Sequence, residues 1–481
     1  MCGTVRNTLK KKKKLGGSLV QASDVKPKLS EKLGYGMGDT ASNIVFQGVN
    51  ILLLYFYTDV VGLSPATVGM IFVAVRIWDA VNDPLMGILA DRTQTRHGKY
   101  RPYLLWMAVP FGLIAFLTFA APSLSEPLKI AYAAVTYLLL MMIYTAINVP
   151  YSALMGVMTS DSEQRTILSS YRFIGAFSAG LIISMAARPL VSFFGGGQGT
   201  EAFDEALGFR LTFLLFASLA TILFLVTFFT TRERLQPPKN TESNVRKDLN
   251  VLLQNRAWIV MAIAGVLTLS NVAVRGAVTF HFFKYFVGDD GTPIFLFLDK
   301  TSVFLTTGSI AFIFGLLFTN MLSKQFGKRN ALMGLTILNA LTVMGFFFIP
   351  ADAFWIMVAV NCLGSVFAGP TPALVWAMYA DVADYGEWRS GRRSTALVFS
   401  AAMFAQKMGL TIGGAGAGWL LFMVGFVANQ EQTPEALLGL QAIFSLVPGA
   451  LALLNGLVLL LYPIREETVR KMGAELAVSR A

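Results

Sequence analysis

The sequence is short of charge, cysteine and histidine, and each shortage excludes a class of protein. Only 14% of its 481 residues are charged, whereas a soluble domain usually carries about 25%. Two cysteines and two histidines are too few for a disulfide framework or a metal cluster. The sequence also lacks a nucleotide-binding loop and a hydrolytic constellation, so we expect neither an enzyme nor an ATP-driven pump.

Apolar residues make up 55% of the chain and recur in stretches of about 20 residues or more, which is long enough to cross a bilayer. The sequence therefore predicts an all-α membrane protein with about twelve transmembrane helices in two six-helix halves. The expected spans are residues 40–62, 65–90, 102–121, 128–158, 166–192, 208–230, 257–287, 296–323, 330–349, 353–381, 395–427 and 437–462.

Lysine and arginine are concentrated in alternate loops. The net charge of +11 therefore reflects the orientation of the chain in the membrane, and we expect no nucleic-acid partner. The segment RHGKYR is basic, whereas GGGQGTEAFDEALG and VGDDGTP are acidic or neutral. Short loops rich in lysine and arginine remain on the cytoplasmic side. We therefore expect a multi-pass protein of a plasma membrane, in particular a bacterial inner membrane, with both termini in the cytoplasm.

The longest polar interruption, residues 230–250, divides the apolar stretches into two sets. Related halves would place a substrate at mid-membrane between them, and one chain holding both halves suffices as a monomer. The expected organisation is a basic tail (1–33), a first half (34–231), a linker (232–255), a second half (256–463) and a C-terminal tail (464–481).

Two acids, Asp79 and Asp83, lie four residues apart inside the apolar segment PATVGMIFVAVRIWDAVNDPLMGILA. On a helix this spacing puts both on one face. Charged groups in a bilayer are costly and mark functional sites, and carboxylate oxygens replace water around a hard cation such as Na+ or H3O+. The alternative is a salt bridge to Arg76 that only helps packing, although one arginine cannot neutralise two carboxylates.

Charged residues at matching helix ends of the two halves predict gates. Carboxylates that face loop guanidiniums would hold one conformation shut and break in the other. In the alternative, these residues only cap helix ends and contribute to the positive charge of cytoplasmic loops. The residues concerned are Asp91, Arg92 and Arg96 after the second span, and Asp381, Asp384, Glu387 and Arg393 after the tenth.

Several motifs carry a family resemblance. The loop Gly87-x-x-x-Asp91-Arg92 resembles the signature of the major facilitator superfamily. The segments LGYGMGDTASN, YFYTDVVGLS, RIWDAVNDPLMG, RHGKYRP, INVPYSALM and YADVADYGEWRSGRRS resemble the glycoside–pentoside–hexuronide:cation symporters, in consistent order from Lys32 to Pro463. The resemblance implies cation-coupled sugar transport in a lipid bilayer, with no cofactor other than the coupling ion, Na+ or H+.

The resemblance also implies roles for single residues. Asp79 and Asp83 match the cation-binding aspartates of the family, and Asn82 and Thr145 match polar residues beside them. Further matches are Arg172, with an arginine linked to the sugar pocket, and Lys407, with a lysine close to the aspartates.

Two positions depart from the melibiose-transporting members of the family. Asn43 and Asn148 stand where those members have aspartates that bind galactosyl hydroxyls, so melibiose is not the expected substrate. Arg172 and Arg275 would favour an anionic sugar, such as a hexuronide or a sulfosugar, through bidentate contacts. In the alternative, Arg275 pairs with backbone carbonyls or with Asp39 and never meets substrate.

A neutral glycoside would then be the substrate. Amide and hydroxyl groups would recognise its hydroxyls, and an aromatic ring would stack on the sugar. The residues expected to do so are Asn43, Asn148, Tyr151, Gln406 and Trp376.

The expected mechanism begins with a cation that enters from outside and is held by Asp79 and Asp83. This neutralises the pair and frees Lys407 to join the sugar pocket, and the loaded carrier then switches. Two alternatives are a lysolipid symporter and a non-transporting membrane sensor. A sensor would need a long cytoplasmic domain, and residues 230–250 and 464–481 are too short for one.

Overall fold

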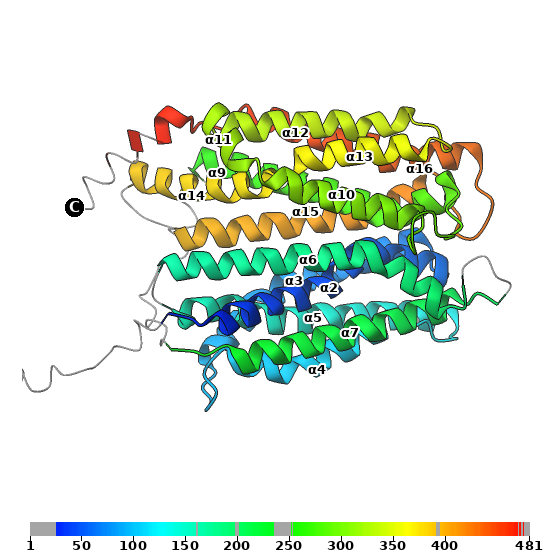
Figure 1. Cartoon of the computed structure of the whole chain (residues 1–481), viewed down its shortest axis with the longest axis horizontal. Coiled ribbons are helices and arrows are strands. Elements are labelled where there is room, and N and C mark those ends of the chain that lie inside the picture. Colours follow the sequence, from blue (N-terminus) through cyan, green and yellow to red (C-terminus); the bar gives the residue numbers. More distant parts are fainter. Residues whose placement is uncertain are drawn as a thin grey trace, which may run out of the picture.

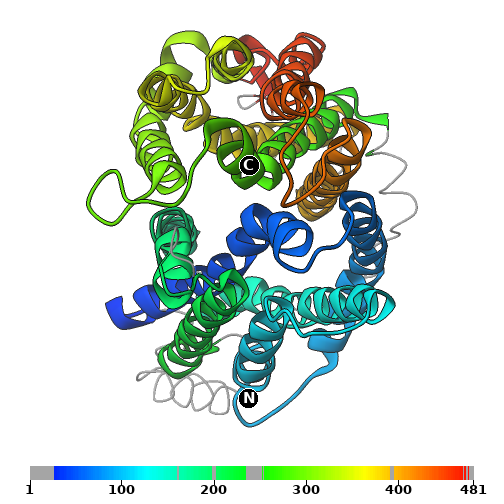
Figure 2. The ribbon, with the colours of Figure 1, turned by 90° about the vertical axis from the view of Figure 1, so that its right-hand side faces the viewer.

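The computed structural model describes residues 26–159, 162–197, 202–234, 252, 254–390, 395–469, 471–472 and 475. In this part of the chain the regular secondary structure is helical and no strand forms. Figure 1 shows the helices arranged as two bundles that lie one above the other. Figure 2, seen along the helices, shows the same two groups facing each other.

The first half contains six long helices. They are α2 (Leu29–Tyr55), α3 (Pro65–Arg92), α4 (Arg101–Thr118), α5 (Glu126–Met158), α6 (Ser162–Phe194) and α7 (Glu205–Thr230).

The second half is cut into more pieces. They are α9 (Arg256–His281), α10 (Lys300–Leu316), α11 (Thr319–Phe326), α12 (Lys328–Gly345), α13 (Phe354–Ala368), α14 (Thr371–Ser390), α15 (Thr395–Met423), α16 (Pro434–Phe444) and α17 (Leu446–Leu459).

The two halves repeat the same packing. In the first half α2 packs against α6 and α7, and α4 packs against α5 and α7. In the second half α9 packs against α15 and α17, and α12 packs against α13 and α17. Moreover, α2 and α9 both end in a π-helical turn, η2 (Phe56–Val60) and η3 (Phe282–Val287). The halves meet where α2, α3 and α6 face α9, α15 and α10.

Glycine permits the closest helix contacts in both halves. A Cβ on Gly175 of α6 would lie 2.4 Å from the Gly36 carbonyl oxygen of α2. A Cβ on Gly413 of α15 would lie 2.4 Å from the Ser270 carbonyl oxygen of α9. Backbones approach this closely only where the side chain is absent, as is common between membrane helices.

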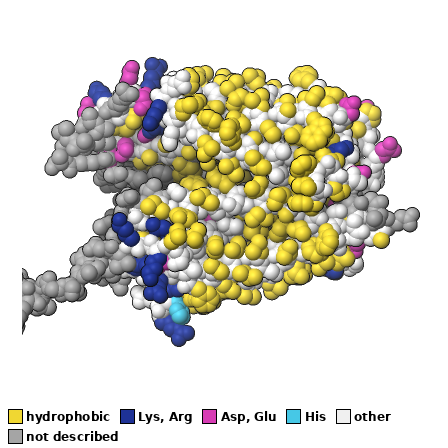
Figure 3. Space-filling view, in the orientation of Figure 1, with side chains coloured by type: hydrophobic (Ala, Val, Ile, Leu, Met, Phe, Trp, Pro, Cys, Tyr) yellow, Lys and Arg dark blue, Asp and Glu magenta, His cyan; other side chains and the backbone are white. Residues whose placement is uncertain are grey.

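The outer surface fits a membrane protein. Eight described helices are long and apolar enough to span a bilayer, or nine if the bent pair of α10 and α11 counts as one span. The expected count of twelve therefore stays a prediction. Figure 3 shows apolar side chains covering the middle of the bundle, with lysine and arginine gathered at one end.

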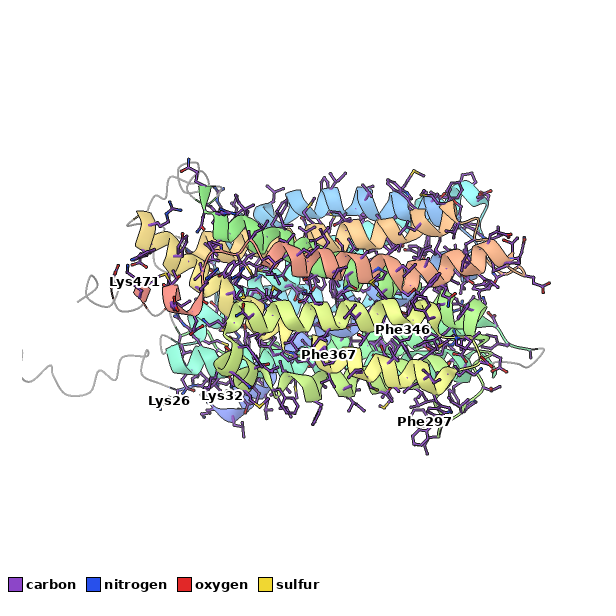
Figure 4. The ribbon with its side chains drawn as sticks, turned by 90° about the horizontal axis from the view of Figure 1, so that it is seen from above. Lys26, Lys32, Phe297, Phe346, Phe367 and Lys471 are labelled. Atoms are coloured by element: carbon purple, nitrogen blue, oxygen red, sulfur yellow. The ribbon has the colours of Figure 1, made fainter. Side chains whose placement is uncertain are left out.

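We call this end, which carries Lys26, Lys32 and Lys471, the basic end (Figure 4). Phe297 marks the opposite end.

Candidate functional site

The aspartate pair lies in the middle of the bundle, between the halves. The start of α3 is fixed by Ser64, whose hydroxyl accepts the Thr67 N–H, and by a proline in the first turn. Both aspartates then face α5, where the Thr145 hydroxyl lies 3.1 Å from Asp79 Oδ1 and 2.9 Å from Asp83 Oδ1. One hydroxyl therefore ties the two carboxylates into a single oxygen-rich site.

Two cationic side chains occupy the remaining carboxylate oxygens. From α15 of the other half, the Lys407 ammonium hydrogen-bonds to Asp83 Oδ2 and lies 3.5 Å from Asp79 Oδ2. Arg76 approaches Asp79 Oδ2 to 3.6 Å from the same helix. Two carboxylates and two cationic groups balance, so the site is neutral in this state. The Lys407 contact is also an ion pair between the halves.

The two aspartates differ in burial. The Asp79 side chain is 2% exposed, whereas Asp83 is 29% exposed and Lys407 is 32% exposed. The pair is therefore reached from the Asp83 side. Asn82, the neighbour of Asp83, keeps a buried Nδ2 that has no hydrogen-bond partner among the described residues.

A second polar cluster lies between α2, α5 and α6. Arg172 Nε and an Nη each lie 3.3 Å from an oxygen of Asp39, a bidentate pair that compensates the guanidinium charge. Asn43 Nδ2 donates to the Asp39 carbonyl oxygen at 2.9 Å, and Asn148 Oδ1 accepts the Ser42 hydroxyl at 2.6 Å. The structure thus brings Asn43, Asn148 and Arg172 to one region of the first half.

The Tyr151 ring packs against Arg172 in this cluster. Its ring centre lies 5.0 Å from the Arg172 guanidinium, its side chain is fully buried, and its hydroxyl donates to the Tyr35 carbonyl oxygen. In this state Tyr151 therefore holds Arg172 in place rather than facing an open space.

Arg275 points away from the aspartate pair. Its guanidinium lies 4.7 Å from the ring centre of Phe346, 4.9 Å from that of Phe444 and 5.9 Å from that of Phe304. Its hydrogen-bond partner is Asn361 Oδ1 at 3.4 Å. All four contacts belong to the second half, and Phe346 lies toward the opposite end (Figure 4). Asp39, the alternative partner, pairs with Arg172 instead.

The other two expected substrate residues come from α14 and α15. Trp376 packs against Tyr379, with ring centres 6.0 Å apart. Gln406 precedes Lys407 on α15 and contacts the Tyr379 hydroxyl. They therefore lie on the Lys407 side of the interface between the halves.

The expected gating residues that the structure describes lie at the basic end. Asp381 pairs with Lys328 at 2.7 Å within the second half. Glu31 of α2 pairs at 2.7 Å with Arg234, which follows α7. Asp384 and Glu387 follow on α14, and Arg92 and Arg96 are exposed. The Asp91 side chain and Arg393 lie outside the described residues.

The opposite end carries a buried latch that the sequence analysis missed. Asp59 of η2 has a fully buried carboxylate, which contacts Lys284 Nζ at 2.9 Å, His281 Nε2 at 3.3 Å and the Tyr285 hydroxyl. Asn429 Nδ2 also donates to the Asp59 carbonyl oxygen at 2.6 Å. We call these five residues the π-turn latch, because η2 and η3 supply Asp59, Lys284 and Tyr285.

A second buried ion pair joins the halves near the latch. Arg188 of α6 and Asp299, which caps α10, are 3.0 Å apart and only 5% and 3% exposed. Ser184 and Ser309 add a hydroxyl contact of 3.2 Å between the same two helices. The halves are therefore closed against each other at the opposite end. The sequence did contain a signal for the latch. The similar aromatic segments YFYTDVV and FFKYFV each follow the first helix of a half and contain the latch residues Asp59, Lys284 and Tyr285.

The family described as MFS/sugar transport protein matches residues 34–466. The chain belongs to this family. Its fold is that of the major facilitator superfamily, and its family makes it a membrane transporter and not an enzyme, as the sequence predicted.

Curated relatives of the family cover nearly the whole chain. YagG of Escherichia coli (strain K12), provisionally named a glycoside/cation symporter, is 41% identical over 94% of this chain and 96% of its own. The inner membrane symporter YicJ of the same strain is 36% identical over 89% of this chain and 90% of the YicJ chain. The isoprimeverose transporter of Lactiplantibacillus pentosus is 33% identical over 94% of this chain and 92% of the transporter. These relatives bear out cation-coupled sugar symport and do not favour the lysolipid and sensor alternatives.

A solved structure supports the fold. It is a bacterial homologue of the human lysosomal transporter Spinster in an inward-facing, unoccupied conformation. The likeness has a TM-score of 0.65 at 14% identity and covers 95% of this chain and 99% of that one. At this identity the likeness concerns the fold alone.

Proposed function

We propose that the protein uses a Na+ or H+ gradient to take up a neutral glycoside across a bacterial inner membrane. In this proposal the basic end and both termini face the cytoplasm, because lysine and arginine gather there. The structure then corresponds to a carrier closed toward the outside by the π-turn latch and by the Arg188–Asp299 pair.

The observation that carries the proposal is the contact between Lys407 and the aspartate pair. The Lys407 ammonium comes from the second half and takes the carboxylate oxygens that a coupling cation would use. Cation binding therefore competes with an ion pair between the halves. Binding of the ion and the relative position of the halves are coupled for this reason.

Alternating access follows from where the charged contacts lie. Opening toward the outside separates Asp59 from Lys284, and Arg188 from Asp299, whereas the aspartate pair lies between this closed end and the basic end. Each positive charge that moves inward through 100 mV contributes roughly 2.3 kcal/mol to uptake. A monomer holds both halves and is sufficient.

A neutral substrate agrees with the charges around the site. Asp39 compensates Arg172, and Arg275 faces phenylalanine rings of its own half. The amides of Asn43 and Asn148 each make a hydrogen bond within the protein and keep further donor and acceptor capacity for sugar hydroxyls. The isoprimeverose transporter is one of the more similar relatives.

An anionic sugar is the second candidate. One relative is named a glucuronide carrier protein homologue, at 28% identity, and another carries the provisional name of a sulfoquinovose importer, also at 28%. The specific observation is Arg275, for which no carboxylate partner is found among the described residues.

Transport by purified protein in proteoliposomes tests the proposal. A panel of labelled neutral glycosides and hexuronides is offered while a Na+ gradient and a pH gradient are imposed separately. The proposal predicts that one gradient drives accumulation of a neutral glycoside above equilibrium. Accumulation of hexuronides only would support the second candidate, and equilibration without accumulation would contradict symport.

A further inference from the structure

The loop between η3 and α10 carries four large apolar side chains in a row at its surface. Ile294, Phe295, Leu296 and Phe297 are 38%, 58%, 79% and 54% exposed. Single apolar residues are ordinary on a protein surface, whereas a contiguous group of large ones marks a contact with another apolar surface. We call residues 294–297 the apolar tip.

The apolar tip is a tight turn with a defined shape. The Ile294 N–H donates to the Leu298 carbonyl oxygen at 2.8 Å, and the Leu298 N–H donates to the Phe295 carbonyl oxygen at 2.9 Å. Leu296 adopts a left-handed φ of 54°, a region that favours glycine and is strained for a bulky side chain. The chain therefore keeps a large apolar side chain where the backbone favours none, and such an outlier points to a function.

The base of the loop is polar and fixed to the bundle. Asp289 accepts the Gly291 N–H at 3.1 Å and the Thr301 N–H of α10 at 3.0 Å. Asp299 caps α10 and pairs with Arg188 of α6 across the interface between the halves. Both ends of the loop are therefore held in place, and the apolar tip is presented away from the bundle.

The apolar tip lies at the level where lipid surrounds the helices. Figure 4 shows Phe297 projecting from the side of the bundle at the opposite end, short of the outermost helix ends. Other aromatic side chains near helix ends are exposed at this end as well: Phe193 of α6 by 75%, Phe348 after α12 by 81% and Trp355 of α13 by 63%. Aromatic side chains in such positions are typical of the membrane–water interface. The apolar tip therefore lies beside that interface.

The charges of the loop exclude an attraction to anionic headgroups. Residues 288–299 contain three aspartates and no lysine or arginine. A polybasic segment binds anionic lipid through its charge, whereas this loop would be repelled. The removal of apolar side chains from water is the driving force that remains for a contact with the bilayer.

We propose that the apolar tip inserts into the boundary between headgroups and acyl chains at the opposite end of the protein. Leu296, the most exposed of the four side chains, enters the lipid, and the strained turn holds it there. Because Asp299 ends the loop and caps α10, the inserted tip also sets the level in the membrane at which α10 begins, beside the Arg188–Asp299 pair. This inference needs a membrane transporter and does not depend on the proposed substrate or coupling ion.

The accessibility of a nitroxide label measures insertion directly. Leu296→Cys in a C2S/C362S background is spin-labelled and reconstituted into phosphatidylcholine vesicles. Power saturation then compares collisions with oxygen, which concentrates in lipid, and with a nickel chelate, which stays in water. We expect the ratio of oxygen to nickel collisions to be at least threefold higher at position 296 than at the control Asp290→Cys, an exposed polar position of the same loop. Equal ratios at the two positions would overturn the proposal.

A second experiment separates the tip from the label, because the nitroxide is itself apolar. The label is placed at Ile294→Cys, once with the native tip and once together with Leu296→Ser and Phe297→Ser. The two serines remove the apolar surface of the tip, so the ratio at position 294 should fall at least threefold. An unchanged ratio would overturn the proposal, since the tip would then not be what holds the loop in lipid.

Two other occupants of the tip give different results. A second copy of the chain would shield position 296 from both collision partners and broaden its spectrum through coupling between labels, which would overturn a contact with lipid. Vesicles that also contain phosphatidylglycerol should give the same ratio as phosphatidylcholine alone, because the loop has no basic side chain. A ratio that rises only with anionic lipid would contradict insertion driven by apolar burial.

Discussion

At the scale of single residues, helical spacing was enough to predict the aspartate pair. Asp79 and Asp83 lie four residues apart on one helix, so local geometry sets their distance. Lys407 follows more than 300 residues later in the sequence, and only a resemblance to a family placed it nearby. The latch residue Asp59 was missed because its partners, His281 and Lys284, also lie far away in the chain.

The Thr145 hydroxyl gives a prediction at this scale. Thr145→Val removes the donor that serves both carboxylates and leaves the shape of the side chain similar. We expect the cation concentration for half-maximal uptake to rise about threefold to tenfold, as for the loss of about 1 kcal/mol of hydrogen bonding. Thr145→Ser keeps the hydroxyl and should stay close to the wild type. Equal effects of both variants would contradict a role for the hydroxyl.

At the scale of helices, apolar length predicted where most of the long helices lie, whereas the breaks were harder to foresee. The bend of 50° between α10 and α11 falls inside the single span expected over residues 296–323. The π-helical turns η2 and η3 were also invisible to apolar periodicity, although both end the first helix of a half. Such turns often occur at functional sites, and here they carry the latch.

The contact between α9 and α15 predicts opposite outcomes for two glycines of α15. In Gly413→Ala the new Cβ would lie 2.4 Å from the Ser270 carbonyl oxygen. A Cβ added at Gly416 would meet no atom of a neighbouring element within 4 Å. We expect Gly413→Ala to destabilise the protein by about 1–3 kcal/mol through overpacking. Gly416→Ala should be neutral or slightly stabilising, since alanine favours helix. Thermal unfolding in detergent measures both, and equal melting temperatures would contradict the packing.

The π-turn latch predicts a change in accessibility. Asp59→Asn removes the charge that holds Lys284 and His281, so the population should shift toward the state open at the opposite end. Ala277 of α9 lines a small cavity between the halves together with Arg76 and Tyr137. Ala277→Cys reports the change through labelling by a membrane-impermeant maleimide in a C2S/C362S background. We expect labelling from that side to be several times faster with Asp59→Asn.

An exposed acid at the same end provides the matched control for the latch. Among the described residues, the hydrogen bonds of the Asp290 side chain are local ones from Thr292, so Asp290→Asn should leave the labelling rate unchanged. Equal rates in Asp59→Asn and Asp290→Asn would contradict a latch.

At the scale of the whole molecule, the sequence predicted two related halves, and the structure repeats one packing pattern in both. What the sequence could not provide was the state of the interface. Which end is closed depends on side chains from different halves, such as Arg188 with Asp299 and Asp59 with Lys284. These pairs join segments that no local pattern connects.

The central claim is that a coupling cation and Lys407 compete for the same carboxylates. The most direct measurement is the Kd of the coupling cation, by calorimetry without sugar, for the wild type, Lys407→Gln and the control Lys300→Gln. We predict that Lys407→Gln binds the cation at least tenfold more tightly, a difference of about 1.4 kcal/mol, because the competing ammonium is gone. Lys300→Gln should match the wild type. Unchanged or weaker cation binding by Lys407→Gln would contradict the account.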